Sequence, residues 1–119
     1  MSQKGRRRSK GDEPKATTDR LMLKRDDIFR MLQDNIDVLR SFGVRRLGLF
    51  GSYARDEATP DSDIDFVVDF EVKSFDAYME LEFFLEDLFK RGIDLVTKDS
   101  IKPKLRPYIE KEVIYAEGL

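Results

Sequence analysis

The sequence predicts a single α/β (α+β) domain in which helices flank a small mixed sheet of three strands. Its length of 119 residues suits one domain, and 40% hydrophobic residues with nine Phe and four Tyr supply one core. Segments with helical periodicity also alternate with short apolar segments of strand length. Helices and a mixed sheet packed in layers are the natural outcome of that alternation.

The first half of this pattern begins with a helix and a strand. The helix is predicted from apolar residues at helical spacing, with acidic residues at its start and Gly43 at its end: Asp26, Asp27, Ile28, Met31, Leu32, Ile36, Leu39 and Phe42. Residues 44–50 (VRRLGLF) then predict a strand. A polar connection follows, with one helical turn expected around residues 52–56.

The second half contains two more strands and two more helices. Residues 64–70 (IDFVVDF) and 93–97 (IDLVT) predict strands. Between them, Ser74 is a candidate N-cap for a helix over residues 75–91 whose core stripe is Tyr78, Leu81, Leu85 and Leu88. Met79, Phe83 and Phe89 lie outside that stripe and suit either a partner surface or extra burial. A last helix is expected from Leu105, Ile109, Val113 and Ala116, with Pro103 or Pro107 near its start.

The composition restricts the chemistry that this domain can perform. It contains no Cys and no His, which excludes disulfides, thiolate catalysis, Cys or His metal sites and imidazole bases. Carboxylates, hydroxyls, backbone groups and cations remain, and carboxylates favour hard divalent ions such as Mg²⁺.

Charge divides the chain into a basic tail and an acidic body. Residues 1–20 hold seven Lys or Arg and three Asp or Glu, whereas residues 21–119 hold 15 and 21. We expect a disordered basic tail over residues 1–19 and one folded domain over residues 20–119. The run Arg6-Arg7-Arg8 suits either a nucleic-acid-binding arm or a solvated tail, while the acidic body disfavours broader nucleic-acid binding. The sequence shows no long apolar run, so a cytoplasmic protein without membrane contact is expected.

Two short motifs lie at the ends of the predicted strands. Gly51-Ser52 comes directly after the first strand, where a tight turn and a hydroxyl suit phosphate binding, although such turns are common without a ligand. Asp63 and Asp65 begin the second strand, and i and i+2 side chains of a strand share a face. Two interpretations remain for this pair: a shared cation, or an edge strand that starts in solvent. Asp94 is a third carboxylate between apolar strand residues, which is costly unless it is exposed or paired with a cation.

Taken together, these motifs resemble a known family. The segment GSYARDEATPDSDIDFVVDF is similar to the signature of the DNA polymerase β-like nucleotidyltransferase superfamily, in particular its minimal single-domain prokaryotic branch. The resemblance extends over residues 44–116, including Asp94 and the closing stretch LRPYIEKEVIYA. It implies the polymerase β-like nucleotidyltransferase fold.

The resemblance also implies roles for individual residues. Gly51 and Ser52 would hold the β and γ phosphates of a nucleoside triphosphate, and ATP is the expected one. Asp63, Asp65 and Asp94 would be catalytic and hold the metal, two Mg²⁺ ions with Mn²⁺ as the alternative, and Asp94 would activate the acceptor hydroxyl. Arg55 matches an Arg of this branch and suits either an anion contact or a surface ion pair. The next position, commonly Gly in the family, is Asp56 here.

The resemblance implies a metal-dependent enzyme that moves a nucleoside monophosphate, AMP in the first place, onto a hydroxyl of a partner protein. The partner would be a helical HEPN-type toxin, with this chain as the antitoxin of an MNT/HEPN pair. Two alternatives remain: a non-catalytic antitoxin or interaction module of the same fold, and a transferase acting on a small molecule or RNA. The sequence leaves a homo-oligomer open.

Overall fold

A four-stranded sheet forms the centre of the protein, whose computed structural model describes residues 23–119. The strand order is β4-β3-β2-β5, with β3 parallel to β4 and β2 antiparallel to both β3 and β5. The strands are β2 (Val44–Phe50), β3 (Ile64–Phe70), β4 (Ile93–Thr97) and β5 (Ile114–Tyr115). The mixed α/β architecture is as predicted, but the sheet has one strand more than expected. The predicted tail over residues 1–19 lies outside the described residues.

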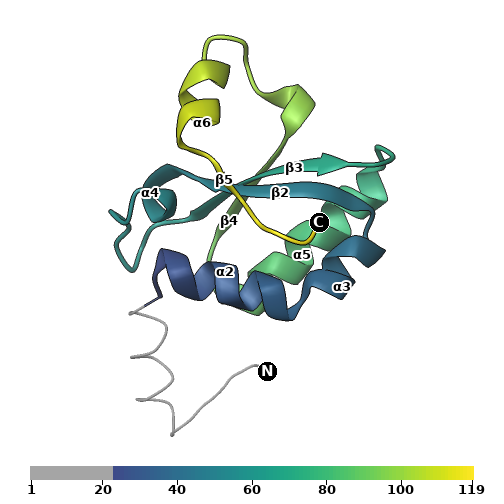
Figure 1. Cartoon of the computed structure of the whole chain (residues 1–119), viewed down its shortest axis with the longest axis horizontal. Coiled ribbons are helices and arrows are strands. Elements are labelled where there is room, and N and C mark those ends of the chain that lie inside the picture. Colours follow the sequence, from purple (N-terminus) through teal and green to yellow (C-terminus); the bar gives the residue numbers. More distant parts are fainter. Residues whose placement is uncertain (1–22) are drawn as a thin grey trace, which may run out of the picture.

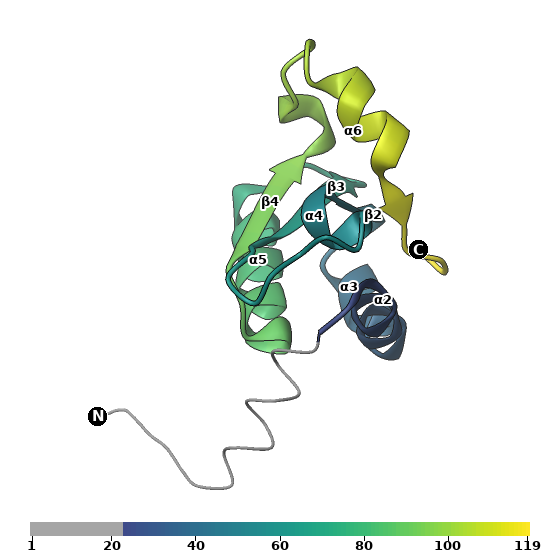
Figure 2. The same ribbon diagram turned by 90° about the vertical axis from the view of Figure 1, so that its left-hand side faces the viewer.

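Three helices cover one face of this sheet, and the C-terminal helix lies on the other side (Figures 1 and 2). The covering helices are α2 (Arg25–Asp34), α3 (Ile36–Ser41) and α5 (Phe75–Phe89). The short helix α4 (Gly51–Ala54) follows β2 directly, and a 3₁₀ turn, η1 (Lys98–Ser100), and α6 (Arg106–Glu112) follow β4. One face of the sheet therefore packs against the hydrophobic core, and the other face is only partly covered.

The core lies between the sheet and α2, α3 and α5. Alternate residues of β3 point into it, because successive strand side chains point to opposite faces. The Phe66 ring is fully buried and lies 6.0 Å from that of Phe89 between ring centroids. Phe89, predicted outside the core stripe, is thus a core residue, whereas Phe83 is 60% exposed and Met79 is partly buried.

The helices differ from their predicted bounds in three places. Asn35 separates α2 from α3, and its Nδ2 donates to the Met31 carbonyl at 2.8 Å, so the predicted first helix is two helices. Helix α5 ends at Phe89, two residues before the predicted end at residue 91, because Lys90 adopts the left-handed conformation with φ 55°. Helix α6 ends at Glu112, so Val113 and Ala116 are not helical.

The chain after α6 turns back along the sheet as strand β5. Tyr115 pairs with Gly48 of β2, and the Arg46 guanidinium lies 3.8 Å above the centre of the Tyr115 ring. Gln33 Nε2 then donates to the Glu117 carbonyl at 2.7 Å. These contacts bring the end of α6 beside the carboxyl end of β2. Among residues 23–119, no helix is both long and apolar enough to cross a membrane.

Candidate active site

Two of the three predicted carboxylates lie side by side on neighbouring strands. Asp65 of β3 and Asp94 of β4 are partners in the parallel register. Neighbouring strands are about 4.8 Å apart, and both side chains point to the face opposite the core. Asp65 is partly buried and Asp94 is exposed. The strand pairing itself therefore brings two negative charges together.

The Gly-Ser turn lies directly against this pair. Phe50, the last residue of β2, pairs with Asp65, so the chain leaves β2 next to that carboxylate. Gly51 is buried and has φ +78°, and a Cβ there would stand 2.9 Å from Asp65 Cγ and collide with Asp65 Oδ2. Only glycine meets both the backbone and the space requirement. Ser52 follows it in α4 and is partly buried.

Asp63 lies against a different segment from Asp65. It precedes the first residue of β3, so the alternation of the strand does not fix its orientation. Its carboxylate lies against the turn before β4, where a Cβ at Gly92 would collide with Asp63 Oδ1. Within the part of the chain that the structure describes, no three acidic side chains are gathered as a metal-binding group. The structure thus brings Asp65 and Asp94 together and leaves Asp63 beside them, facing Gly92.

The acidic cluster is electrostatically unfavourable without a cation. The pKa of Asp65 is raised from 3.8 to about 6, first by burial, then by the nearby Asp94, and less by the charges of Asp63 and Glu112. A raised carboxyl pKa means that the surroundings disfavour the charged form, as they do when no cation lies beside it. The donor set is made entirely of carboxylate oxygens, which fits a hard divalent cation.

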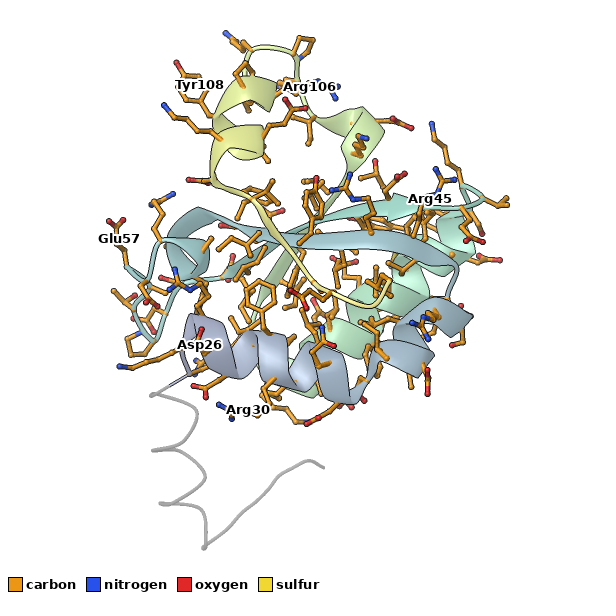
Figure 3. All side chains as sticks on the ribbon, in the orientation of Figure 1. Asp26, Arg30, Arg45, Glu57, Arg106 and Tyr108 are labelled. Carbon is orange, nitrogen blue, oxygen red and sulfur yellow. The ribbon has the colours of Figure 1, made fainter. Side chains whose placement is uncertain are left out.

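Arg55 forms ion pairs at the end of α4. Its Nε lies 2.9 Å from Glu57 Oε1 and its Nη1 lies 3.0 Å from Glu112 Oε1. Glu57 lies in the loop after α4, at the outer end of the molecule (Figure 3). Asp56, which follows Arg55, has φ 61°, a conformation that favours glycine and that Asp tolerates better than most residues. Asp56 therefore adopts a conformation in which the Gly common in the resembled family would be free of strain.

Sequence reasoning missed Glu112 and Arg91. Glu112 Oε2 accepts a hydrogen bond of 2.9 Å from the Gly51 N–H, across 61 positions of the chain, and no local pattern signals such a contact. Arg91 Nη1 donates to the Pro60 carbonyl at 3.3 Å, which ties the loop before Asp63 to the end of α5. Both residues shape the surroundings of the carboxylates from distant segments.

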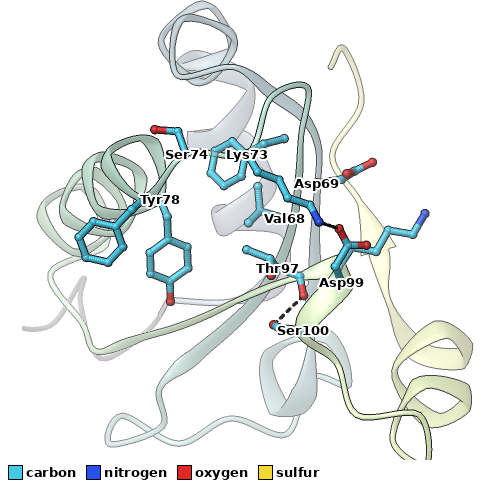
Figure 4. Close-up of a pocket in the computed structure, with 11 residues that line it drawn as sticks. Val68, Asp69, Lys73, Ser74, Tyr78, Thr97, Asp99 and Ser100 are labelled. Carbon is cyan, nitrogen blue, oxygen red and sulfur yellow. Dashed lines mark hydrogen bonds and ion pairs between the residues drawn. The ribbon is translucent and has the colours of Figure 1, made fainter.

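A separate cavity of about 340 Å³ lies at the other end of β3 and β4 (Figure 4). Its lining is largely apolar and includes Val68, Phe75 and Tyr78, together with the ion pair between Lys73 and Asp99. Val68 lies three positions after Asp65 along β3, which corresponds to about 10 Å. The cavity is therefore distinct from the carboxylate cluster.

Comparison with known proteins identifies the family to which this chain belongs. The model of the nucleotidyltransferase domain family matches residues 32–116, which include the turn and all three carboxylates. This chain belongs to that family. The nucleotidyltransferase is 44% identical to protein adenylyltransferase MntA of Thermococcus cleftensis over 96 residues, covering 79% of this chain and 97% of the relative.

Solved structures confirm the nucleotidyltransferase fold. A protein assigned as a minimal nucleotidyltransferase aligns with a TM-score of 0.69 and 29% identity, covering 78% of this chain and 96% of the other. A toxin–antitoxin complex with AMP-PNP aligns with a TM-score of 0.58 and 26% identity, covering 82% and 75%. A complex of the tri-AMPylated HEPN toxin of Shewanella oneidensis with an MNT antitoxin gives 0.51 and 25%, covering 80% and 70%. The predicted family, fold and enzyme class are thereby confirmed.

Proposed function

We propose that this nucleotidyltransferase transfers AMP from ATP to a hydroxyl group of a HEPN-type partner protein and acts as the antitoxin of the pair. A relative at 44% identity is a protein adenylyltransferase, and similar structures include a complex with AMP-PNP and one with an AMPylated HEPN toxin. ATP, the proposed AMP donor, is a cytoplasmic nucleotide, and we place the pair in that compartment.

One observation carries the proposal: anion donors and paired carboxylates lie on adjoining strand ends. Gly51 packs against Asp65, which lies in register with Asp94. The Gly51 N–H and the Arg55 guanidinium both contact the carboxylate of Glu112, which supports their assignment as donors to oxygen anions. A triphosphate on these donors has its α-phosphate within reach of the carboxylates, which is the arrangement that transfer at the α-phosphorus requires.

The residues at this site fit a divalent cation in charge and in ligand type. We assign Asp63, Asp65 and Asp94 as its ligands, with a change of side-chain rotamer at Asp63. Mg²⁺ is the expected ion, and Mn²⁺ accepts the same oxygen ligands. When bound, such ions neutralise phosphate charge and polarise the reacting oxygens.

The protein's own groups then position the substrates and move one proton. Gly51 and Ser52 hold the β and γ phosphates, and Arg55 contacts their outer oxygens. The acceptor oxygen forms a bond to the α-phosphorus, the bond between that phosphorus and the bridging oxygen breaks, and pyrophosphate leaves with its electrons. Asp94, the more exposed of the paired carboxylates, receives the acceptor proton.

Two labels on ATP test this function. The purified protein is incubated with Mg²⁺, a helical partner encoded beside it, and ATP labelled at either the α or the γ phosphate. We expect the partner to acquire the α label and not the γ label. The variant Asp63→Ala with Asp65→Ala should abolish labelling, whereas Asp69→Ala, on the same strand but paired with Arg45 at 3.8 Å, should keep it.

The other outcomes separate the alternatives. A partner that is bound and neutralised without either label would identify a non-catalytic antitoxin. Transfer of the α label to RNA or a small molecule alone would identify a different acceptor. Labelling by the γ phosphate would contradict nucleotidyl transfer itself.

A further inference from the structure

The carboxylate of Glu112 occupies both anion donors at the end of β2. Its Oε2 accepts from the Gly51 N–H at 2.9 Å, and its Oε1 accepts from Arg55 Nη1 at 3.0 Å. Each oxygen of the carboxylate thus uses one donor, as two oxygens of a phosphate would. The side chain is 28% exposed, so solvent and solutes reach this contact.

We propose that Glu112 is a built-in competitor of the nucleotide, holding the phosphate donors until a triphosphate displaces it. The inference rests on the proposed function, since it concerns the same site. A carboxylate and a phosphate cannot share these donors, because two anions in contact repel each other. Nucleotide binding therefore includes the cost of breaking the two contacts of Glu112.

The position of Glu112 allows its side chain to move away from Gly51 and Arg55. It is the last residue of α6, a helix of seven residues without any buried residue, and the two-residue strand β5 follows one residue later. Arg55 does not lose its orientation when Glu112 leaves, because Glu57 holds its Nε at 2.9 Å. Departure of Glu112 also removes one of the negative charges that act on Asp65.

The release of Glu112 is coupled to the C-terminal strand. Val113, the next residue, lies against Gly48, so close that a Cβ at Gly48 would collide with Val113 Cγ2. Tyr115 follows and pairs with Gly48. Movement of the end of α6 should therefore also displace β5. The amide resonance of Tyr115 can detect that displacement.

Binding of ATP with Mg²⁺ to four forms of the full chain tests the competition. Calorimetry compares the wild type with Glu112→Gln, Glu112→Ala and the matched control Glu110→Gln, an exposed residue of the same helix. We expect Glu112→Ala to bind about tenfold more tightly, because two charge-assisted hydrogen bonds of a partly exposed group no longer compete. Glu112→Gln should gain less, since its amide oxygen still accepts from Gly51. Glu110→Gln should match the wild type.

Equal or weaker binding by both folded Glu112 variants would overturn the inference, because Glu112 would then be structural or part of the nucleotide-bound site. Circular dichroism and urea unfolding establish that each variant is folded. Amide resonances add an independent readout: nucleotide should shift both Gly51 and Tyr115 in the wild type, but mainly Gly51 in Glu112→Ala.

Inorganic tripolyphosphate separates this inference from the proposed function. If ATP binds to no form of the protein, the proposed function fails, and tripolyphosphate then probes the same donors without a nucleoside. Tighter binding of tripolyphosphate by Glu112→Ala than by the wild type supports the competition. Equal binding, or none to any form, overturns it.

Discussion

Replacing Asp65 with Asn should stabilise the metal-free protein at neutral pH. The folded protein raises the pKa of Asp65 from 3.8 to about 6, mainly through burial and the neighbouring Asp94. Ionised Asp65 therefore opposes folding at pH 7. Asn keeps the size of the side chain and can still donate a hydrogen bond to Asp94, but it removes the charge.

The size of the effect follows from the difference between the folded and unfolded pKa values. Taken in full, pKa values of 3.8 and about 6 correspond to roughly 3 kcal/mol of the free energy of unfolding at neutral pH. Because Asp65 is only partly buried, solvent screening reduces this to about 1 kcal/mol. For a domain of this size, such a gain raises the melting temperature by about 4–8 °C.

The pH dependence gives the prediction its sign. A carboxyl group with a raised folded pKa contributes fully to stability below its unfolded pKa, and that contribution is lost as the pH rises through the folded pKa. The advantage of Asp65→Asn should therefore be near zero at pH 3.8, grow between pH 4 and 6, and remain constant above about pH 6.

Urea unfolding in EDTA at several pH values measures this advantage directly. The matched control is Asp69→Asn, on the same strand and face, which loses its ion pair with Arg45 at 3.8 Å and should gain nothing at neutral pH. A loss of stability in Asp65→Asn at pH 7.5, or a gain of equal size at pH 4, would refute the electrostatic account of this cluster.

Three further changes test the turn, the core and the cation. Gly51→Ala should lower the free energy of unfolding by about 2 kcal/mol or more and abolish ATP binding, because strain at φ +78° adds to the collision with Asp65. Gly43→Ala, at φ +83° with open space around it, measures the strain alone in the same urea assay. Equal losses of stability in the two variants would disprove the collision. Phe66→Ala should cost about 3–5 kcal/mol, since the ring is fully buried against Phe89; a loss below about 1 kcal/mol would contradict that packing. Calorimetry should detect ATP binding with Mg²⁺ and little in EDTA, because the carboxylates repel a triphosphate; equal binding in both would remove the cation from the account.

The sequence predicted β2, β3 and β4 with their observed bounds, because each is a short apolar segment bordered by polar or turn residues. It missed β5 for a physical reason. Val113 and Ala116 continue the helical spacing of Leu105 and Ile109, so periodicity cannot distinguish a longer helix from a helix followed by an edge strand. Pairing with Gly48 and Leu49 of β2 decides the conformation, and that contact is distant in sequence.

The candidate site shows the same division between local and distant information. Local patterns placed Asp65 and Asp94 in strands and Gly51 at a turn, but the register that pairs Asp65 with Asp94 is a contact between distant segments. The contact of Glu112 with Gly51 depends on how α6 folds over the sheet, and nothing in the neighbouring residues signals it. The sequence pattern placed Asp63 at the start of the strand, on the same face as Asp65. The residue instead precedes β3, and its carboxylate lies against Gly92.

The most direct test of the account is the mass of the purified partner protein after incubation with ATP and Mg²⁺, with wild-type enzyme or with Asp94→Asn. We predict the added mass of one or more AMP groups with the wild type. With Asp94→Asn, the rate should fall by roughly 10²-fold or more, because the base for the acceptor proton is lost, while Gly51 and Asp65 preserve ATP binding by calorimetry. An unmodified partner with the wild type, or equal modification with Asp94→Asn, would contradict the proposed chemistry.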